Sequence, residues 1–464
     1  MTLASCDSRK TAGENPFFTE WDTPHGVPPF DKILPEHFMP AFERGMSLHE
    51  AEIDAITSNK DEATFENTIL AYDNAGQMLA QTELVFGMLC AAETNDRMQA
   101  LQEQAMPLLA AHRDKIRLDD KLFVRVKEVY DRRAALEARR RADAVHVARK
   151  PYDSFGACRG VARRRSRRPS LKEINGQLSL TAVKFGNNIL AENNNFVLEL
   201  KSDELDGLPA GIRDAAREKA QQMGKGDKWV FTLHKPSLIP LLTYSTRRDL
   251  REKIYKAYLN RCNNGDEYDN KQLINDFIRL RTEKAHLLGY PSYAAYVVAD
   301  EMAGTTDARF TACSTRSGRR RSNAPRASWP RWTRFCRRTS PVPPSNASVG
   351  GCVTAEKLRK QNYALDEEML RPYFSLENVQ GGIFYLANRL YGITFQPIVV
   401  PLYHPMRSPT RCSMPMARTW VCSISTISPA TARARAPGAA TMSSRPIRTA
   451  SAWRPVVSVV CNFT

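Results

Sequence analysis

Three arginine-rich segments without a hydrophobic period divide this sequence and limit what the chain can fold into. They cover residues 137–170, 304–354 and 405–454, and they hold 29 basic residues against 4 acidic ones. A helix or strand that faces a core needs apolar side chains at a period of 3.6 or 2 residues. Phrases such as "TARARAPGAATMSSRPIRT" show neither period. We therefore expect the regular elements to lie between these segments.

The positive charge of the chain is concentrated in the same segments. The whole chain carries +17, which by itself would indicate nucleic acid or a membrane surface as partner. Without the three segments, the remaining 329 residues sum to −8. All but one of the basic residues in the segments are Arg, a composition typical of GC-rich DNA translated out of frame. We therefore interpret the segments as slipped reading frame.

The alternative is a set of basic arms on a non-catalytic peptide- or nucleic-acid-binding protein. Trp329, Trp332 and Phe335 lie among arginines and keep this reading open for the second segment. The other two segments lack such aromatic interleaving and also lack Lys, apart from Lys150. We therefore expect no nucleic-acid partner.

Between the segments, the hydrophobic period is that of α-helices. Asn95 precedes an apolar pattern as an N-cap residue, and Pro107 inside that pattern predicts a kink or break. Thr246 and Asp249 have the spacing of a capping box, and Gly289 fits a helix C-terminus.

Two helices are predicted with one apolar face each. The faces consist of Leu250, Ile254, Ala257 and Tyr258, and of Ile274, Ile278, Ala285 and Leu288. Strand signals are confined to residues 395–403 and 455–463. The predicted fold class is mostly α, with a small β element near the C-terminus. No apolar run reaches the 18 or so residues of a transmembrane helix.

Sequence motifs for catalysis are few. No two of the eight histidines stand at i, i+4, so the two-imidazole face of a zinc protease is missing. "HEAEI" at His49–Ile53 has Ile where the second His belongs, and we predict helical surface there. "NNGDEYDN" at 263–270 resembles a cation loop in composition but lacks EF-hand spacing, so it predicts a helix-connecting loop. His234 and Tyr373 could line a cleft, although a packed or surface role is favoured.

The cysteines and the N-terminus give further expectations. No CxxC pair occurs among Cys6, Cys90, Cys262 and Cys461, which argues against a disulfide framework or structural zinc. Leu3–Cys6 looks like the lipobox of a bacterial lipoprotein signal, but the charged and apolar regions that should precede it are missing. The compartment is periplasm or cell envelope if such a signal precedes Cys6, and cytoplasm otherwise.

The ordered stretches together resemble one family, the zinc peptidases that include thimet oligopeptidase, oligopeptidase A and bacterial peptidyl-dipeptidase. The opening stretch is most similar to peptidyl-dipeptidase. The spacing between matching stretches is close to that of the family, which favours frame slips over inserted arms. The matching stretches are "NPFFTEWDTPHGVPPFDKILPEHFMPAFERGM" (15–46), "TFENTILA" (64–71), "LKEINGQLSLTAVKFGNNILAENNNF" (171–196), 250–303 and 355–395.

The resemblance implies a helical two-lobed ellipsoid around a channel for short peptides. In the family, zinc is held by the two His of HExxH and a later Glu, while the Glu inside the motif acts as general base. A segment like "PVVSVVCNFT" leads into that helix, and the sequence ends before it. The resemblance therefore assigns no catalytic or metal residue here, and the substrate-binding residues stay unknown.

The resemblance implies zinc and an oligopeptide substrate for the intact family member. This chain is expected to be inactive, to bind no zinc and to be a monomer. Its helices would expose apolar faces that normally pack against the absent part, and such faces aggregate. The predicted domains are a tail or signal remnant (1–14), the helical N-terminal lobe (15–136, continued in 171–303), the three arginine-rich segments, the start of the catalytic lobe (355–404) and a strand before the zinc helix (455–464).

Overall fold

The computed structural model divides the chain into two compact units. The first comprises residues 1–180 and 384–462, and the second comprises residues 181–383 and 463–464. Within the described part of the chain, no helix combines the length and the apolar character needed to cross a bilayer. The structure describes residues 14–133, 148, 151–152, 155, 168–299, 301, 347–364, 367–403, 407–413, 420–426, 438–441 and 456–460.

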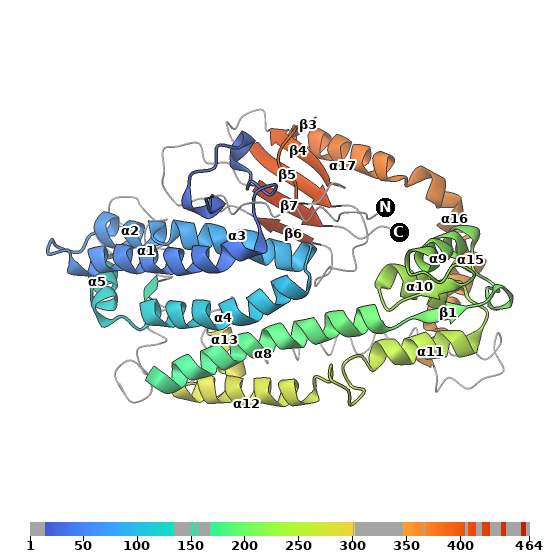
Figure 1. Cartoon of the computed structure of the whole chain (residues 1–464), viewed down its shortest axis with the longest axis horizontal. Helices are drawn as coiled ribbons and strands as arrows, with labels where there is room; N and C mark the ends of the chain where they lie inside the picture. Colours follow the sequence, from blue (N-terminus) through green and yellow to red (C-terminus); the bar gives the residue numbers. More distant parts are fainter. Residues whose placement is uncertain are drawn as a thin grey trace, which may run out of the picture. The chain divides into compact units, whose positions relative to one another are not determined.

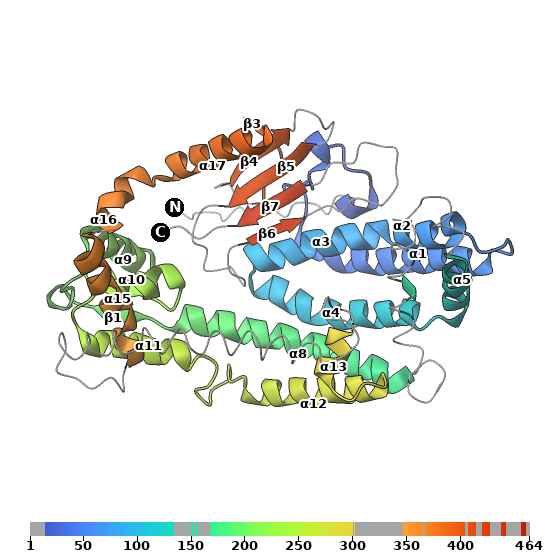
Figure 2. The same cartoon turned by 180° about the vertical axis from the view of Figure 1, so that it is seen from behind.

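The first unit is built on long helices, of which α1, α3 and α4 pack side by side (Figures 1 and 2). A further helix, α8, begins in this unit and continues into the second. The elements are η1 (Pro16–Phe18), η2 (Pro24–Gly26), η3 (Pro35–His37), α1 (Phe38–Ser58), a π-helical turn η4 (Phe65–Leu70), α2 (Ala71–Asn74), α3 (Gln77–Ala92), α4 (Asp96–Arg117), α5 (Asp120–Asp131) and α8 (Arg168–Asn195).

Helix α4 confirms one prediction and corrects another. Asn95 is its N-cap, and the Asn95 side chain accepts a hydrogen bond from the Met98 amide at 3.0 Å. The sequence predicted a kink or a break at Pro107, and the helix runs through Pro107 without a break, so the break is wrong. Ala105 and Leu109 on either side of the proline are fully buried. Packing of these neighbours stabilises the helix at Pro107, where the missing backbone N–H removes one helical hydrogen bond.

The first unit also carries a mixed five-stranded sheet in the order β3-β4-β5-β7-β6 (Figure 2). Neighbouring strands are antiparallel, except that β5 and β7 are parallel. The strands are β3 (Thr394–Pro397), β4 (Arg407–Ser413), β5 (Trp420–Thr426), β6 (Gly438–Thr441) and β7 (Val456–Val460).

This sheet confirms the small β element near the C-terminus and extends it. Strands β3 and β7 fall where the sequence predicts strands. Strands β4, β5 and β6 fall in the segment 405–454, where we expected no regular element. Backbone hydrogen bonds to neighbouring strands define these three strands, and a side-chain period does not reveal such pairing.

The core of the first unit joins distant parts of the chain. Phe86 lies against Phe38 and Phe42, with ring centroids 4.9 and 5.3 Å apart. Val400 and Val456 belong to the same buried cluster, and Val456 is completely inaccessible to solvent. The start of β7 therefore packs in the core that α1 and α3 build.

The second unit is helical with one small sheet. Strands β1 and β2 pair antiparallel, with Leu198 opposite Phe231 and Leu200 opposite Trp229. This sheet was not predicted, because each strand has only three residues and shows no readable alternation. The elements are β1 (Leu198–Leu200), η6 (Ser202–Glu204), α9 (Ala210–Gln222), β2 (Trp229–Phe231), α10 (Lys235–Tyr244), α11 (Arg248–Leu259), α12 (Lys271–Leu287), α13 (Tyr293–Val298), α15 (Ala347–Tyr363), α16 (Glu367–Leu370), η8 (Arg371–Tyr373) and α17 (Leu376–Tyr391).

Helix α11 has the predicted buried face but not the predicted cap. Leu250 and Ile254 are buried in the core of the second unit, and Ala257 and Tyr258 pack against it. The helix begins at Arg248, so the capping box at Thr246 is wrong. The Thr246 hydroxyl instead donates to the Asp206 carbonyl oxygen at 3.2 Å. The hydroxyl that a local cap would use is therefore hydrogen-bonded to a residue distant in the sequence.

Helix α12 follows its predicted face only in its second half. Ala285 and Leu288 are buried, whereas Ile274 is 45% exposed and Ile278 is 62% exposed. Gly289 follows the helix with a φ of +87°, which confirms the predicted C-terminus. The helical period was predicted correctly. Among the described residues, however, none covers the first half of this apolar face.

Helix α17 exposes a large amount of apolar surface, as we expected for some helices of this chain. None of its residues is buried. Its large exposed apolar side chains are Ile383, Tyr385, Leu386, Leu390 and Tyr391, with exposed fractions of 56–69%.

Candidate functional site

The His-Glu pair of "HEAEI" is part of a polar cluster between helices. His49 Nδ1 on α1 lies 3.0 Å from His112 Nε2 on α4. Glu50 Oε1 lies 3.4 Å from His112 Nδ1, and Lys115 Nζ lies 2.6 Å from Glu50 Oε2. His112 is buried and His49 is half-buried. The prediction of helical surface is therefore wrong for His49, because its ring faces a partner helix.

Burial favours the neutral form of both imidazoles of this cluster. The pKa of His49 is lowered first by burial and then by His112, against the attraction of Glu52 and Glu50. The pKa of His112 is also lowered, chiefly by burial, against the hydrogen bond that the Glu50 carboxylate accepts from it and the charge of Glu50. Because neutral imidazole has one N–H, one ring can donate to the other. The arrangement links α1 to α4 without an ionised histidine.

Gly76, the residue just before α3, packs against the same cluster. The Gly76 amide donates to Glu52 Oε2 at 2.6 Å, and Gly76 has a φ of +74°. A Cβ atom at this position would come within 2.8 Å of His49 Nδ1. Glycine is therefore required here both by its backbone conformation and by the approach of the His49 ring.

The described residues do not fit a zinc ion. Among them, no group of three or more His, Cys, Asp or Glu side chains could hold a metal. The sequence contains no HExxH. A zinc site needs three or four such ligands in tetrahedral reach, and the His49–His112 pair supplies two. We therefore derive no metal-dependent step from these residues.

The two residues considered for a cleft take other positions. His234 precedes α10, and its Nε2 lies 3.3 Å from Asn194 Oδ1. Its pKa is lowered by burial and by the charges of Lys219 and Arg261. Tyr373 is 72% exposed and lies on the surface.

The segment 263–270 is a helix-connecting loop, as predicted. It joins α11 to α12. Asn264 Nδ2 donates to both carboxylate oxygens of Glu192, and Asp269 Oδ2 accepts from the Gly265 amide at 2.8 Å. Asp269 also pairs with Lys271 at 2.6 Å. Asp269 is thus engaged in fixing the loop.

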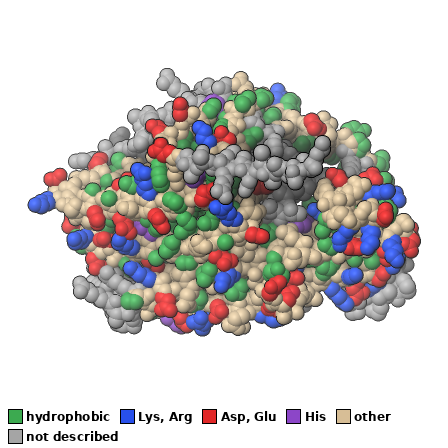
Figure 3. All heavy atoms as spheres, in the orientation of Figure 1, with side chains coloured by type: hydrophobic (Ala, Val, Ile, Leu, Met, Phe, Trp, Pro, Cys, Tyr) green, Lys and Arg blue, Asp and Glu red, His purple; other side chains and the backbone are tan. Residues whose placement is uncertain are grey.

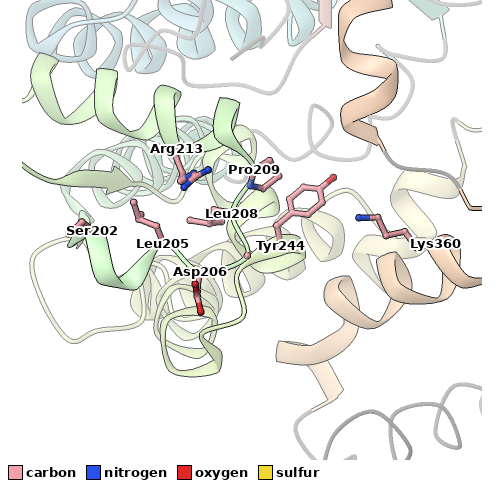
Figure 4. A pocket seen from close by; sticks show the side chains of 9 residues that line it. Ser202, Leu205, Asp206, Leu208, Pro209, Arg213, Tyr244 and Lys360 are labelled. Atoms are coloured by element: carbon pink, nitrogen blue, oxygen red, sulfur yellow. The ribbon is translucent and has the colours of Figure 1, made fainter.

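The second unit contains a cavity that the sequence did not indicate. Its volume is about 520 Å³, and it opens between the loop before α9, the end of α10 and helix α15 (Figure 4). Its lining includes Leu205, Asp206, Leu208, Arg213, Tyr244 and Lys360. Lys360 comes from a part of the chain far from the others, so no linear motif could have connected them.

Cys90 and Cys262 are buried free thiols. Burial raises the pKa of Cys90 to about 12 and that of Cys262 to about 11. Near neutral pH both thiols are therefore protonated, which disfavours a nucleophilic role for either. The lipobox-like Leu3–Cys6 and the aromatic residues of the second arginine-rich segment lie outside the described residues.

Comparison with known proteins matches residues 241–464 to a family model described as Peptidase family M3. The chain is 32% identical to dipeptidyl carboxypeptidase of Escherichia coli over 396 residues, which cover 84% of this chain and 57% of that protein. It is 28% identical to the chloroplastic and mitochondrial organellar oligopeptidase A of Arabidopsis thaliana, covering 85% and 50% of the two chains.

A third relative is oligopeptidase A of Escherichia coli, with 25% identity covering 82% of this chain and 56% of that protein. The chain thus spans about half the length of the curated relatives it matches. The matches cover most of this chain and confirm the resemblance on which the predicted fold class and chemistry rest. Residues 241–464 thus match peptidase family M3, and the chain is similar over most of its length to dipeptidyl carboxypeptidase and oligopeptidase A.

Proposed function

We propose that this chain is part of a zinc-dependent peptidyl-dipeptidase, an enzyme that releases C-terminal dipeptides from oligopeptides. The observation that carries the proposal is the 32% identity to dipeptidyl carboxypeptidase across 84% of the chain. The identity to oligopeptidase A of the same organism is 25%. Both relatives are peptidases by name, so the class of reaction does not depend on which of them is more similar.

The chain as written is proposed not to hydrolyse peptides. Its sequence has no HExxH motif, and its described residues do not form a metal site. In this family, zinc would supply an activated water and a polarised carbonyl. The helical units of this chain would supply surface for binding and orienting a peptide.

The purified full chain can be tested with an N-acetylated oligopeptide in the presence of Zn²⁺. We expect no release of a C-terminal dipeptide above a control that contains a chelator, as measured by mass spectrometry. We also expect less than one zinc per chain after dialysis, as measured by elemental analysis. Chelator-sensitive release of dipeptides would contradict the proposed inactivity and would still support the family assignment.

The arginine-rich segments are proposed to be slipped reading frame. The family model covers residues 241–464 and so runs across two of these segments, which agrees with near-normal spacing between the matching stretches. Resequencing the coding DNA across the three segments tests this proposal. A corrected frame should replace arginine-rich runs by sequence with a helical or strand period, whereas a confirmed sequence would favour basic arms.

A further inference from the structure

Helix α17 carries one continuous apolar face. Five apolar residues recur along it at intervals of three or four positions, which places them on one side of an α-helix. They are Leu376, Val379, Ile383, Leu386 and Leu390. Ile383, Leu386 and Leu390 are 58%, 56% and 62% exposed, and no residue of α17 is buried. The helix therefore presents about four turns of apolar surface that the described part of the chain leaves open.

The other sides of α17 differ from this face. Phe384 stacks on Phe395 of β3, with ring centroids 4.1 Å apart, so one side of the helix contacts the edge strand of the sheet. The helical period places Glu377 and Arg389, the charged residues of α17, away from the apolar face. Figure 3 shows hydrophobic side chains at the surface on the upper right of the view, where Figure 1 places α17. The helix is thus held by one side and open on another.

The exposure of apolar side chains is local to this part of the chain. More than half of the large exposed apolar side chains among the described residues lie between residues 363 and 399. Helix α1, by contrast, buries Phe38, Phe42, Ile53 and Ile56. Contiguous exposed apolar surface is typical of a site where another polypeptide or a membrane binds.

The length of the relatives indicates which of these partners fits. The match to dipeptidyl carboxypeptidase covers 84% of this chain but 57% of that protein, so about two fifths of the relative has no counterpart here. A membrane surface is disfavoured because α17 carries one acidic and one basic residue, whereas helices that bind anionic lipid have a basic polar face. A polypeptide partner from the unmatched part of the relative therefore fits better.

We propose that the apolar face of α17 is the docking surface for the polypeptide that corresponds to the unmatched part of dipeptidyl carboxypeptidase. Helices pack by fitting the side-chain ridges of one into the grooves of another, and a stripe of about four turns offers such a surface. The inference rests on the proposed function, because the partner is defined by a peptidase relative.

Gly382 provides room for close packing on this face. It borders the face one turn before Leu386, and a Cβ atom built on it would meet nothing within 4 Å. Nothing within the chain therefore requires glycine here, although glycine weakens a helix interior relative to alanine. A partner backbone that approaches α17 closely would use this open space.

Co-expression tests the docking surface. The full chain with an affinity tag is produced together with an untagged fragment that comprises the unmatched part of dipeptidyl carboxypeptidase of Escherichia coli. We expect one fragment to co-purify per chain and amide hydrogen exchange of residues 376–391 to slow in the complex. I383D/L390D should reduce the co-purified fragment at least about tenfold, because unpaired charges would face an apolar partner.

Matched controls separate the face from general effects of substitution. Leu259 on α11 is 60% exposed, and L259D should leave co-purification unchanged. Gly381 lies on the other side of α17 from the apolar face, and a Cβ atom there also meets nothing within 4 Å. G382L should therefore weaken the complex, whereas G381L should not. Circular dichroism melts show whether each variant is folded, and only folded variants are compared.

A linked form of the protein keeps the test independent of how well the fragment folds alone. In this form the fragment is joined to the full chain by a flexible glycine-serine linker, which raises its effective concentration at the face. Hydrogen exchange of residues 376–391 should be slower in the linked protein than in the chain alone. The same exchange rate in both would overturn the inference.

Two further results would also contradict it. One is equal co-purification of the fragment with folded I383D/L390D. The other is a discrete dimer of the chain that persists beside the fragment and is lost in I383D/L390D, which would make a second copy the occupant. Mass spectrometry of an added oligopeptide reports hydrolysis separately. A protected α17 without dipeptide release would count against the proposed function alone, and dipeptide release without protection of α17 would sink the docking surface alone.

Discussion

Single side chains in this protein take roles that depend on partners distant in sequence. His49 stands in a near-motif for a metal site, yet its ring nitrogen faces His112 on another helix. Arg125 is buried, and its guanidinium donates to the carbonyl oxygens of Asn59 and Asp61 at 2.7 and 3.1 Å. Neither role follows from the local sequence, because each needs an acceptor that only the fold brings near.

The histidine pair predicts a pH-dependent stability. Burial lowers the pKa of both His49 and His112 in the folded chain. An unfolded histidine has a pKa of about 6.5, so the unfolded chain binds more protons as the pH falls below that value. The contribution of the pair is therefore complete above about pH 6.5 and is lost as the pH falls toward the lowered pKa values.

Urea denaturation at a series of pH values checks this expectation. The free energy of unfolding should fall below about pH 6.5 less steeply in H49Q/H112Q than in the unmodified chain. H286Q, which removes an exposed histidine outside the pair, is the control substitution. Equal slopes in the double variant and the unmodified chain would show that the pair does not titrate on unfolding.

The helices of this chain differ in how well their sequence patterns predict their burial. The face of α11 that begins with Leu250 is buried as its period predicts, whereas Ile274 and Ile278 on α12 are exposed. A period of 3.6 residues defines a face, but it does not say whether another element covers that face. Helix α17 is the clearest case, because its exposed side chains Ile383, Leu386 and Leu390 share one face.

The exposed face of α17 predicts self-association. Contiguous apolar surface of this kind promotes aggregation in water. L386S and L390S together should reduce light scattering and dye binding by the purified chain. Leu259 on α11 is similarly exposed, at 60% against 62% for Leu390, and serves as the control. If L259S lowers the scattering as much as the double variant does, aggregation does not depend on α17.

At the scale of the whole molecule, residues from both ends of the described chain pack together in the core of the first unit. Phe17 and Val456 lie in one buried cluster although they are separated by almost the entire sequence. Contacts of such long range form late and cost loop entropy, so they depend on a well-packed centre. Val399 lies next to the buried Val400 and yet is 92% exposed.

These two environments give a matched pair of substitutions. V456D places a charge at a fully buried position and should lower the free energy of unfolding by at least about 3 kcal/mol. V399D places the same charge at an exposed position and should change the free energy of unfolding by less than about 0.5 kcal/mol. Thermal or urea melts measure both. Similar values for the two variants would show that Val456 is not in the core in solution.

The sequence by itself determined the fold class, the family and the positions of most helices. Hydrophobic period and capping residues act locally, and a helix forms its backbone hydrogen bonds within one segment. Helix α4 with its cap at Asn95 and the C-terminus of α12 at Gly289 were predictable for this reason.

The tertiary structure alone decided three strands of the five-stranded sheet, the histidine pair and the cavity. Strands β4 to β6 are defined by pairing with neighbours, not by their own pattern. The cavity needs Arg213 and Lys360, which come from helices far apart in the chain. These features depend on which segments meet in space, and that is set by the burial of whole faces against one another.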